Sequence, residues 1–534
     1  MAKKPVKYRS MASASYSSIR ICKYQISCSF RAVSRLGSLR RTADSFARLV
    51  NARAISRSAH PIIHPTLPIH PMRFLRQARG VAYTVSFALL VGCNGESIDS
   101  SVASSLAVAD AASRAAIFTI PLYQFYAVRQ RYIAQGIAPN TFLHSRQLAD
   151  SSSTSVTKPN HDTLYSDAML QLDRGPVRID IPSSGTRYFS LALMDAYTNN
   201  FAIRGTSVDN GMAKTFWVVG PSWQGTVPAD VTVLRSSTNA VWALARTYVG
   251  GASDYPAAWA VQNQLVASQS ADVGVTSWDS VDKQIPPGYA NWTSYFRYVN
   301  QLLKKNPPAP QDADVLANAL DVIGVGPTQT FEPPSTDAAS ISTGAAQALA
   351  SLTSSGGKQQ VPDKSVAGNA WTVAPSAIGN YGTDYALRAH VALSGLGALP
   401  SSEATYYAST GPTNAAGVTY DGNSVYEIAF PAGQLPPARA FWSLTLYGGT
   451  NQAQAYFYPN PDQIYALSYP ASNFQFADDG SLVLAVSHTR PAGVPTSNWL
   501  PAPAGAFNLT LRAYLPDLSI LNGTYTLPPM IRVQ

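Results

Sequence analysis

The sequence predicts a mainly β protein with a helical part: a β-sandwich, then a small α-helical region, then a jelly-roll or other two-sheet β-domain. Three observations support this. Short aromatic and aliphatic runs separated by turn residues fill 141–284 and 371–534. The stretch between them, 285–370, has helical periods. The 35 Gly, 38 Pro and 28 Tyr favour sheets with many turns.

Residues 72–92 have the pattern of a lipoprotein signal peptide. Met72 is followed by three arginines and then by an apolar stretch that is short for a membrane span. The sequence Leu90-Val91-Gly92-Cys93 resembles the bacterial lipobox, in which the cysteine is acylated. We therefore expect lipidation at Cys93 and an anchor in the membrane of a bacterial cell envelope. Asn94 is not the aspartate that retains such proteins at the inner membrane, which favours the outer membrane. The alternative is a buried N-terminal helix with a chance cysteine.

The basic charge of the chain lies in its first 92 residues. Residues 1–92 hold 16 Lys and Arg and one acid, which leaves 23 basic and 29 acidic residues from Cys93 onwards, a net charge of −6. Nucleic acid is therefore not an expected partner. If Met72 is the true start, residues 1–71 are a non-native upstream extension, which we expect to be disordered. After Cys93 there is no cysteine, so no disulfide, thiol nucleophile or Cys metal site is expected.

The remaining elements follow in order. We expect a tether and an N-terminal helix within 93–140, with Pro121 as a kink. Strands are predicted in the sandwich at 187–194, 215–220 and 240–244. The helical region is predicted to contain helices at 290–305, 312–323 and 337–351, and the last domain to contain one at 383–391.

The C-terminal domain, 371–534, gives the clearest strand patterns, at 440–447 and 507–514. In the second of these, Phe507, Leu509 and Leu511 lie on one face, and Asn508, Thr510 and Arg512 on the other. Asp-Gly pairs predict hairpins around 477–486 and 418–422.

Three groups of motifs carry a family resemblance. They are 159–166 (PNHDTLYS), 194–201 (MDAYTNNF), and a C-terminal set at 381–389, 441–445 and 498–503. In this order they resemble the paired families of unknown function numbered 1254 (N-terminal) and 1214 (C-terminal), over about 141–534. The resemblance implies an immunoglobulin-like sandwich, a C-terminal jelly-roll-like domain and a helical part. It implies an exported bacterial protein and no settled activity.

Polar side chains beside the predicted strands are the candidate site residues. Asp, Tyr and Asn at strand exits suit recognition of hydroxyl groups, and they can also pin loops structurally. His161 stands where the resembling family is expected to vary, which argues against a catalytic histidine. Arg388 either anchors an anion or forms a surface pair with Asp384, and Trp442 either stacks on a sugar or packs in a core. The catalytic suspects are Asp162, Tyr165, Asp195 and Tyr197. The ligand-binding candidates are Asn160, Asp162, Tyr165, Asp195, Tyr197, Asn199, Asn200, Arg204, Arg388 and Trp442.

Three functions remain open at this point. The first is an envelope lipoprotein that binds a small polar or carbohydrate ligand through its β-domain loops. The second is a hydrolase or lyase with an Asp/Tyr site, which requires the four suspects to converge in one cleft. The third is an architectural protein that assembles into homo-oligomers. No metal-ligand spacing, phosphate-binding loop or dinucleotide-binding motif is present, so no metal or cofactor is predicted.

Overall fold

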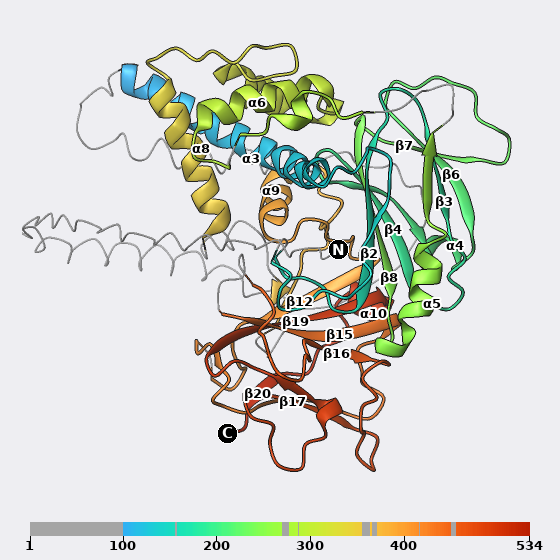
Figure 1. Cartoon of the computed structure of the whole chain (residues 1–534). Helices are drawn as coiled ribbons and strands as arrows, with labels where there is room; N and C mark the ends of the chain where they lie inside the picture. Colours follow the sequence, from blue (N-terminus) through green and yellow to red (C-terminus); the bar gives the residue numbers. More distant parts are fainter. Residues whose placement is uncertain are drawn as a thin grey trace, which may run out of the picture. The chain divides into compact units, whose positions relative to one another are not determined.

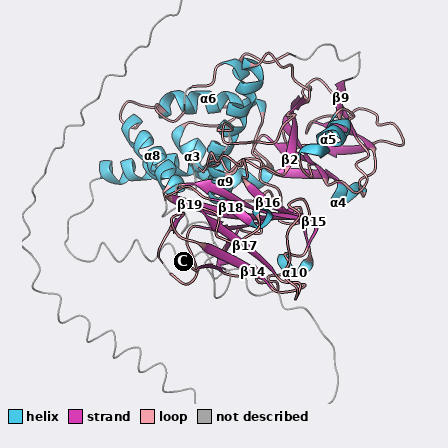
Figure 2. Cartoon of the chain, turned by 60° about the horizontal axis from the view of Figure 1, so that its bottom comes forward, coloured by secondary structure: helices cyan, strands magenta, loops and turns pink. Residues whose placement is uncertain are grey.

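The computed structural model describes residues 100–154, 157–269, 277–286, 288–354, 364–365, 371–415, 417–449 and 455–534. They belong to one compact unit, residues 96–534. The chain is mainly β, with a helical region between two β-domains, as the sequence predicts (Figures 1 and 2). The expected upstream extension (1–71), the signal peptide (72–92) and Cys93 lie outside the described residues.

The N-terminal domain is a sandwich of two sheets. The first sheet has the order β1 (Leu143–His144), β2 (Thr163–Gln171), β8 (Ala240–Tyr248), β4 (Phe189–Asp195) and β5 (Asn200–Gly205). The second has the order β7 (Thr232–Arg235), β6 (Lys214–Val219), β3 (Val177–Ile181) and β9 (Val266–Gln269). Alternate residues of the facing strands fill the core, including Leu170, Ile179, Leu191, Phe216 and Ala243. Two short helices, α4 (Thr206–Asp209) and α5 (Tyr255–Gln262), flank this sandwich.

The C-terminal domain also has two sheets that share a core. The third sheet has the order β10 (Lys364–Ser365), β11 (Thr372–Val373), β12 (Ala404–Ser409), β19 (Ala506–Pro516), β15 (Ala438–Gly448) and β16 (Ala466–Tyr469), with β13 (Tyr420–Asp421) also on β19. The fourth has the order β18 (Trp499–Pro501), β17 (Leu482–Ser487), β14 (Tyr426–Phe430) and β20 (Met530–Arg532). A short helix, α10 (Leu518–Leu521), follows β19. Phe507, Leu509 and Leu511 point into the core between the sheets, on one face of β19 as predicted.

The helical layer is built around α3 (Ser100–Ala134), which contains Pro121 and packs against α8 (Ala338–Thr353) and α9 (Tyr385–Ser394). Figure 1 shows α3 in blue beside α6 (Trp292–Lys305) and α8. By length and composition α3 could cross a membrane, but half of its most apolar window is buried inside the molecule. This burial is typical of a core helix, because its apolar side chains already have protein partners.

One local prediction is wrong. The Asp-Gly turns exist, but they do not form the expected hairpins: β17 pairs with β14 and β18, and β13 pairs with β19. The helix expected at 312–323 is present as a continuous helical segment over 310–323, in which α7 (Ala313–Val315) lies between a 3-10 turn and a π-helical turn. Turn residues fix where the chain reverses, but packing of the whole domain decides which strands pair.

Candidate functional site

A cavity of about 850 Å³ lies where the first and third sheets face each other. This volume is within the range of small-molecule sites in proteins. The first sheet contributes Tyr165, Asp167, Trp242, Leu244 and Arg246 to the lining. The third sheet contributes Tyr406, Ala408, Thr510, Arg512 and Tyr514. Parts of α3, α8 and α9, together with β1 and residues 145–154, 157–160 and 395–398, complete the wall. The cavity is therefore built from both β-domains and the helical layer.

The side of the cavity on the first sheet follows from the alternation of one strand. Val241, Ala243 and Ala245 of β8 point into the sandwich core, so the residues between them point the opposite way. These are Trp242, Leu244 and Arg246, and all three line the cavity. Along β8 the cavity surface thus changes from apolar to cationic over four residues, roughly 13 Å.

Arg246 is a buried cation at the polar end of this surface. Its side chain is 5% exposed, and its guanidinium carbon lies 5.2 Å from the centre of the Tyr165 ring, its neighbour on β2. Nη2 donates to the carbonyl of Gly397 at 2.6 Å, but Nη1 has no hydrogen-bond partner among the described residues. No carboxylate among the described residues lies within ion-pair distance of Arg246. The carboxylate of Glu403 accepts a hydrogen bond from Tyr188 at 2.9 Å. It interacts with the charge of Arg246 electrostatically, from beyond ion-pair distance.

Arg512, in contrast, is fully engaged in the contact between the two β-domains. It donates to Thr445 Oγ1 at 2.9 Å, to the hydroxyl of Tyr447 at 2.7 Å and to the carbonyl of Lys158 at 3.1 Å. Asp162 accepts a hydrogen bond from Ser443 at 2.7 Å. Burial raises the pKa of the Asp162 carboxyl, and the Ser443 hydrogen bond and the charge of Arg512 oppose this rise. These contacts join the start of β2 to the polar face of the third sheet.

Asn160 and Tyr165 complete this contact. The Asn160 amide donates to the hydroxyl of Tyr514 at 2.6 Å, and its oxygen accepts from the backbone N–H groups of Asp162 and Thr163. His161 bonds the carbonyl of Ala149 through Nδ1 at 2.6 Å, outside the cavity lining. Of the residues predicted from the first motif, Asn160 and Tyr165 line the cavity, while Asp162 lies behind it.

Asp167 is a carboxyl on the cavity wall with an unusual ionisation. It follows Tyr165 on the same face of β2 and receives a hydrogen bond from the hydroxyl of Tyr132 on α3. Burial raises its pKa to about 6, since water cannot solvate the charged form well there. This residue titrates close to neutral pH.

The second predicted cluster has a structural role at the far end of β4. Asp195 accepts hydrogen bonds from the backbone N–H groups of Tyr197 and Asn199, both at 2.9 Å, and from Ser237 at 2.8 Å. The Tyr197 hydroxyl donates to the carbonyl of Asn306, and the Asn200 amide to that of Ala398. These bonds hold the β4–β5 turn in place.

The four catalytic suspects do not converge. Thr163, next to Asp162, pairs with Tyr248, whereas Asp195 pairs with Val241, seven residues away along β8. At about 3.3 Å per residue this separation is roughly 23 Å. Neither Asp195 nor Tyr197 lines the cavity. The condition for an Asp/Tyr hydrolase or lyase site built from these four residues is therefore not met.

Three further candidates lie outside the cavity lining. Arg388 is not a surface residue: it is 1% exposed and lies about 5 Å from the rings of Phe118, Tyr197 and Tyr385, because α9 is packed under α3. Its expected partner Asp384 instead caps α9, accepting from the N–H of Leu387.

Trp442 and Arg204 also lie away from the cavity. Trp442 is in the core between the third and fourth sheets, since it points to the apolar side of β15. Arg204 forms an ion pair with Asp209 in α4 and lies over the ring of Phe216. Neither lines the cavity, so the ligand-binding role predicted for them has no support in the geometry.

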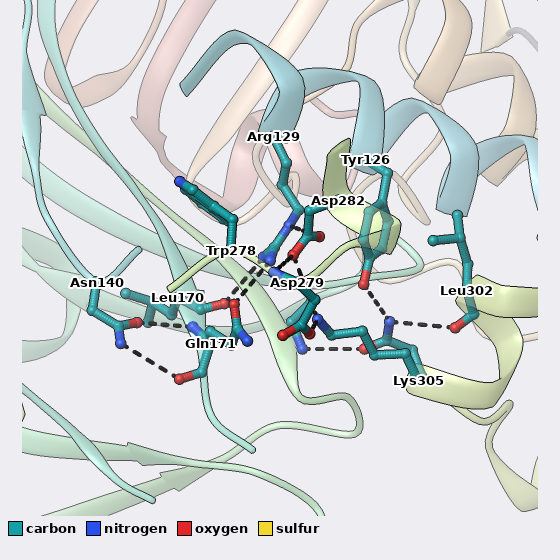
Figure 3. Close-up of polar contacts among 12 residues, drawn as sticks. Tyr126, Arg129, Asn140, Leu170, Gln171, Trp278, Asp279, Asp282, Leu302 and Lys305 are labelled. Carbon is teal, nitrogen blue, oxygen red and sulfur yellow. Dashed lines mark hydrogen bonds and ion pairs between the residues drawn. The ribbon is translucent and has the colours of Figure 1, made fainter. Parts of the chain in front are cut away.

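A separate buried ionic network joins α3 to the first sheet and to the end of α6 (Figure 3). Arg129 Nε donates to Asp282 Oδ1 at 3.0 Å, and both side chains are fully buried. Lys305 contacts Asp279 and lies 3.5 Å from Asp282. Arg129 also donates to Gln171 Oε1 on β2 at 3.4 Å. The two cations of the network, Arg129 and Lys305, face the two carboxylates Asp279 and Asp282. The charges of the network therefore balance one another.

Sequence reasoning missed Arg246, Asp167 and the cavity itself. Arg246 lies beyond the strand predicted at 240–244, because β8 continues four residues further, to Tyr248. Its spacing from Trp242 and Leu244 is the signal that could have placed it on the same face. Within the described ranges, no group of three or more His, Cys, Asp or Glu side chains is placed to hold a metal ion.

Taken together, the fold and the cavity define a class: a mainly β protein whose two β-domains both line a cavity of small-molecule size. Residues 139–269 match the model of DUF1254, described as a protein of unknown function. Residues 403–518 match that of DUF1214, described in the same way. The chain therefore carries a DUF1254 domain followed by a DUF1214 domain, in the predicted order.

Two solved structures resemble this chain. The VPA0106 protein from Vibrio parahaemolyticus is 22% identical with a TM-score of 0.61, over 80% of this chain and 100% of that one. An uncharacterised protein from Burkholderia cenocepacia is 14% identical with a TM-score of 0.38, over 77% of this chain and 87% of that one. The first similarity shows a shared fold. No curated protein matches the chain.

Proposed function

We propose that this protein is a lipid-anchored protein of the bacterial cell envelope that binds a small molecule in the cavity between its two β-domains. One observation carries the binding proposal. The 850 Å³ cavity is lined by the buried Arg246, whose Nη1 has no hydrogen-bond partner in the part of the chain that the structure describes. A buried donor without a partner is costly, and a bound ligand is one way to satisfy it.

The lipid anchor is supported by the sequence. A basic head, a short apolar stretch and the lipobox-like Leu90-Val91-Gly92-Cys93 occur in the required order. Growth with radiolabelled palmitate should label the wild-type protein and leave Cys93→Ala unlabelled and released from the membrane fraction. Equal labelling of both proteins would refute acylation at Cys93.

The binding proposal is tested by a thermal-shift screen of the purified protein against sugars, organic acids, small alcohols and divalent cations. A ligand that binds only the folded state raises the free energy of unfolding, by about 2.7 kcal/mol at a hundred times its Kd. The melting temperature rises as a result. Since the cavity has polar and apolar walls, we expect hits among small organic molecules rather than cations.

A matched pair of variants shows where a hit binds. Ala408 lines the cavity on β12, whereas Ala429 is exposed on β14 of the fourth sheet. Ala408→Phe should fill the cavity and abolish the shift, and Ala429→Phe should keep it. A hit that persists in Ala408→Phe would place the ligand elsewhere. A screen without any hit on folded protein would contradict the proposal.

A further inference from the structure

We infer that the ligand of the interdomain cavity is a small amphipathic anion, a monocarboxylate whose head binds Arg246 and whose apolar body lies along Trp242 and Leu244. This inference rests on the proposed function and names the chemical class of the ligand. Three features of the cavity carry it: the balance of charge in its lining, the unused hydrogen-bonding capacity of Arg246, and the order of polar and apolar groups along β8.

The lining has an excess of positive charge. Among the described residues it includes the cations Arg131, Lys158, Arg246 and Arg512, and one carboxylate, Asp167. The chain from Cys93 onwards has a net charge of −6, so this excess is a local property of the cavity. A lining of one sign attracts ligands of the opposite sign.

Arg246 is the cation available for a direct ion pair. Arg512 has Asp162 nearby and three acceptors from two domains. Within the described ranges, Arg246 has one carbonyl acceptor, a tyrosine ring and an Nη1 without a hydrogen-bond partner. An unpaired charge in the interior is expensive, and an oxyanion from a ligand provides both the charge and the acceptor that are lacking.

The tyrosine rings around Arg246 favour binding of a carboxylate group, because they offer hydrogen-bond donors and carry no negative charge that would repel it. Tyr165, Tyr406 and Tyr514 line the same cavity and surround the guanidinium. Tyr406 and Tyr514 already accept hydrogen bonds, from the Leu399 N–H and the Asn160 amide respectively. Their hydroxyl protons remain available to donate to a carboxylate.

Next to Asp167, one part of the wall is apolar and leads away from Arg246 along β8. Trp242 and Leu244 lie on the same face of β8, and Leu387, Val391 and Leu396 cover them from α9 and the loop after it. The cavity thus offers an anion-binding end at Arg246 and an apolar surface on Trp242 and Leu244, with Trp242 roughly 13 Å from Arg246 along β8. A short-chain fatty acid or an aromatic acid has the matching distribution of charge and apolar surface.

The test compares ligands that share a tail but differ in the head group. We would titrate the protein calorimetrically with octanoate, 1-octanol, octylamine and inorganic phosphate. Octanoate should bind at least tenfold more tightly than octanol, and octylamine and phosphate should be weaker still. Octanol binding as tightly as octanoate would refute the anionic head while leaving the cavity a binding site. Phosphate binding as tightly as octanoate would refute the apolar body.

Variants then test the role of Arg246. Arg246→Met should weaken octanoate binding about tenfold to a hundredfold and leave octanol binding nearly unchanged. Arg178→Met removes the same charge from the exposed side of β3 and should have no effect. If both variants weaken octanoate equally, the effect is one of net charge and the inference fails. Because the head-group comparison uses the wild-type protein, it remains decisive if Arg246→Met does not fold. If no ligand of any kind binds the wild-type cavity, the proposed function itself fails.

Discussion

At the scale of single residues, burial sets the chemistry of this protein more than residue type does. Asp167 and Asp195 are both carboxylates of the first sheet, and burial raises the pKa of each. Asp195 is surrounded by donors, whereas Asp167 has the Tyr132 hydroxyl and the cavity. We therefore expect substitution of Asp167 and of Asp195 to change the free energy of unfolding in opposite directions.

Asp167→Asn should stabilise the protein at neutral pH. The pKa of Asp167 is about 6 in the folded state and 3.8 in its ordinary state, so the folded protein binds the extra proton between about pH 4 and 6. This group's contribution to stability therefore decreases as pH rises through that window. We expect the variant to gain up to about 3 kcal/mol at pH 7 and nothing below pH 4, measured by urea unfolding.

Asp180→Asn is the opposite control for this experiment. Although burial opposes it, the hydrogen bond from Arg178 lowers the pKa of Asp180. Its stabilising contribution is present at neutral pH and is lost as pH falls, so this variant should be less stable at pH 7. If the free energy of unfolding of wild type and of Asp167→Asn changes with pH in the same way, the raised pKa assigned to Asp167 is contradicted.

Asp195→Ala should destabilise the fold without changing ligand binding. The substitution leaves the buried N–H groups of Tyr197 and Asn199 and the Ser237 hydroxyl without their acceptor. We expect a loss of about 2 to 4 kcal/mol in unfolding free energy and an unchanged ligand Kd. A catalytic or binding role for Asp195 would instead appear as lost affinity in a stable protein.

At the scale of elements, alternation and helical period in the sequence locate most strands and helices. The predicted strand at 507–514 corresponds to β19, and its polar face, with Thr510 and Arg512, becomes a wall of the cavity. Strand pairing was not predictable from turns, because β17 and β13 pair with strands distant in sequence. The cavity was not predictable either, since it depends on how two sheets face each other.

Gly344→Ala should disrupt the contact between α3 and α8. A Cβ at Gly344 would lie 1.9 Å from the carbonyl oxygen of Ala109, so the two helices would have to separate. Alanine in place of glycine normally favours a helix by about 1 kcal/mol, but here the clash outweighs that gain. We expect a net loss of about 2 kcal/mol by urea unfolding. Gly505→Ala, which meets nothing within 4 Å, should change stability by less than about 0.5 kcal/mol.

At the scale of the whole molecule, buried polar contacts connect parts that are distant in sequence. The Arg129–Asp282 network connects the helical layer to the first sheet, and Asp162, Asn160 and Arg512 connect the first sheet to the third. The sequence pattern of each element predicts that element alone and does not predict its contacts with the others. The sequence therefore indicates the domains better than it indicates their contact.

Asp282→Ala should weaken the whole molecule severely. It leaves the guanidinium of Arg129 buried without its carboxylate partner, which typically costs about 3 to 5 kcal/mol. The matched control is Glu332→Ala, which removes an exposed pair with Arg297 at 2.9 Å and should cost less than about 1 kcal/mol. Calorimetric melting of both variants checks this, and similar small losses in both would show that the buried pair is dispensable.

The two-sided construction of the cavity has a consequence for inheritance. Arg246 and Trp242 come from the DUF1254 domain, and Tyr406, Arg512 and Tyr514 from the DUF1214 domain. A gene fragment that encodes one domain alone supplies the cavity-lining residues of that domain only, and the cavity does not form. Under the proposed function, selection on the site acts on both domains at once, and we expect a change on one wall to be accompanied by a change on the facing wall. The two domains are expected to persist, duplicate and be lost as a pair.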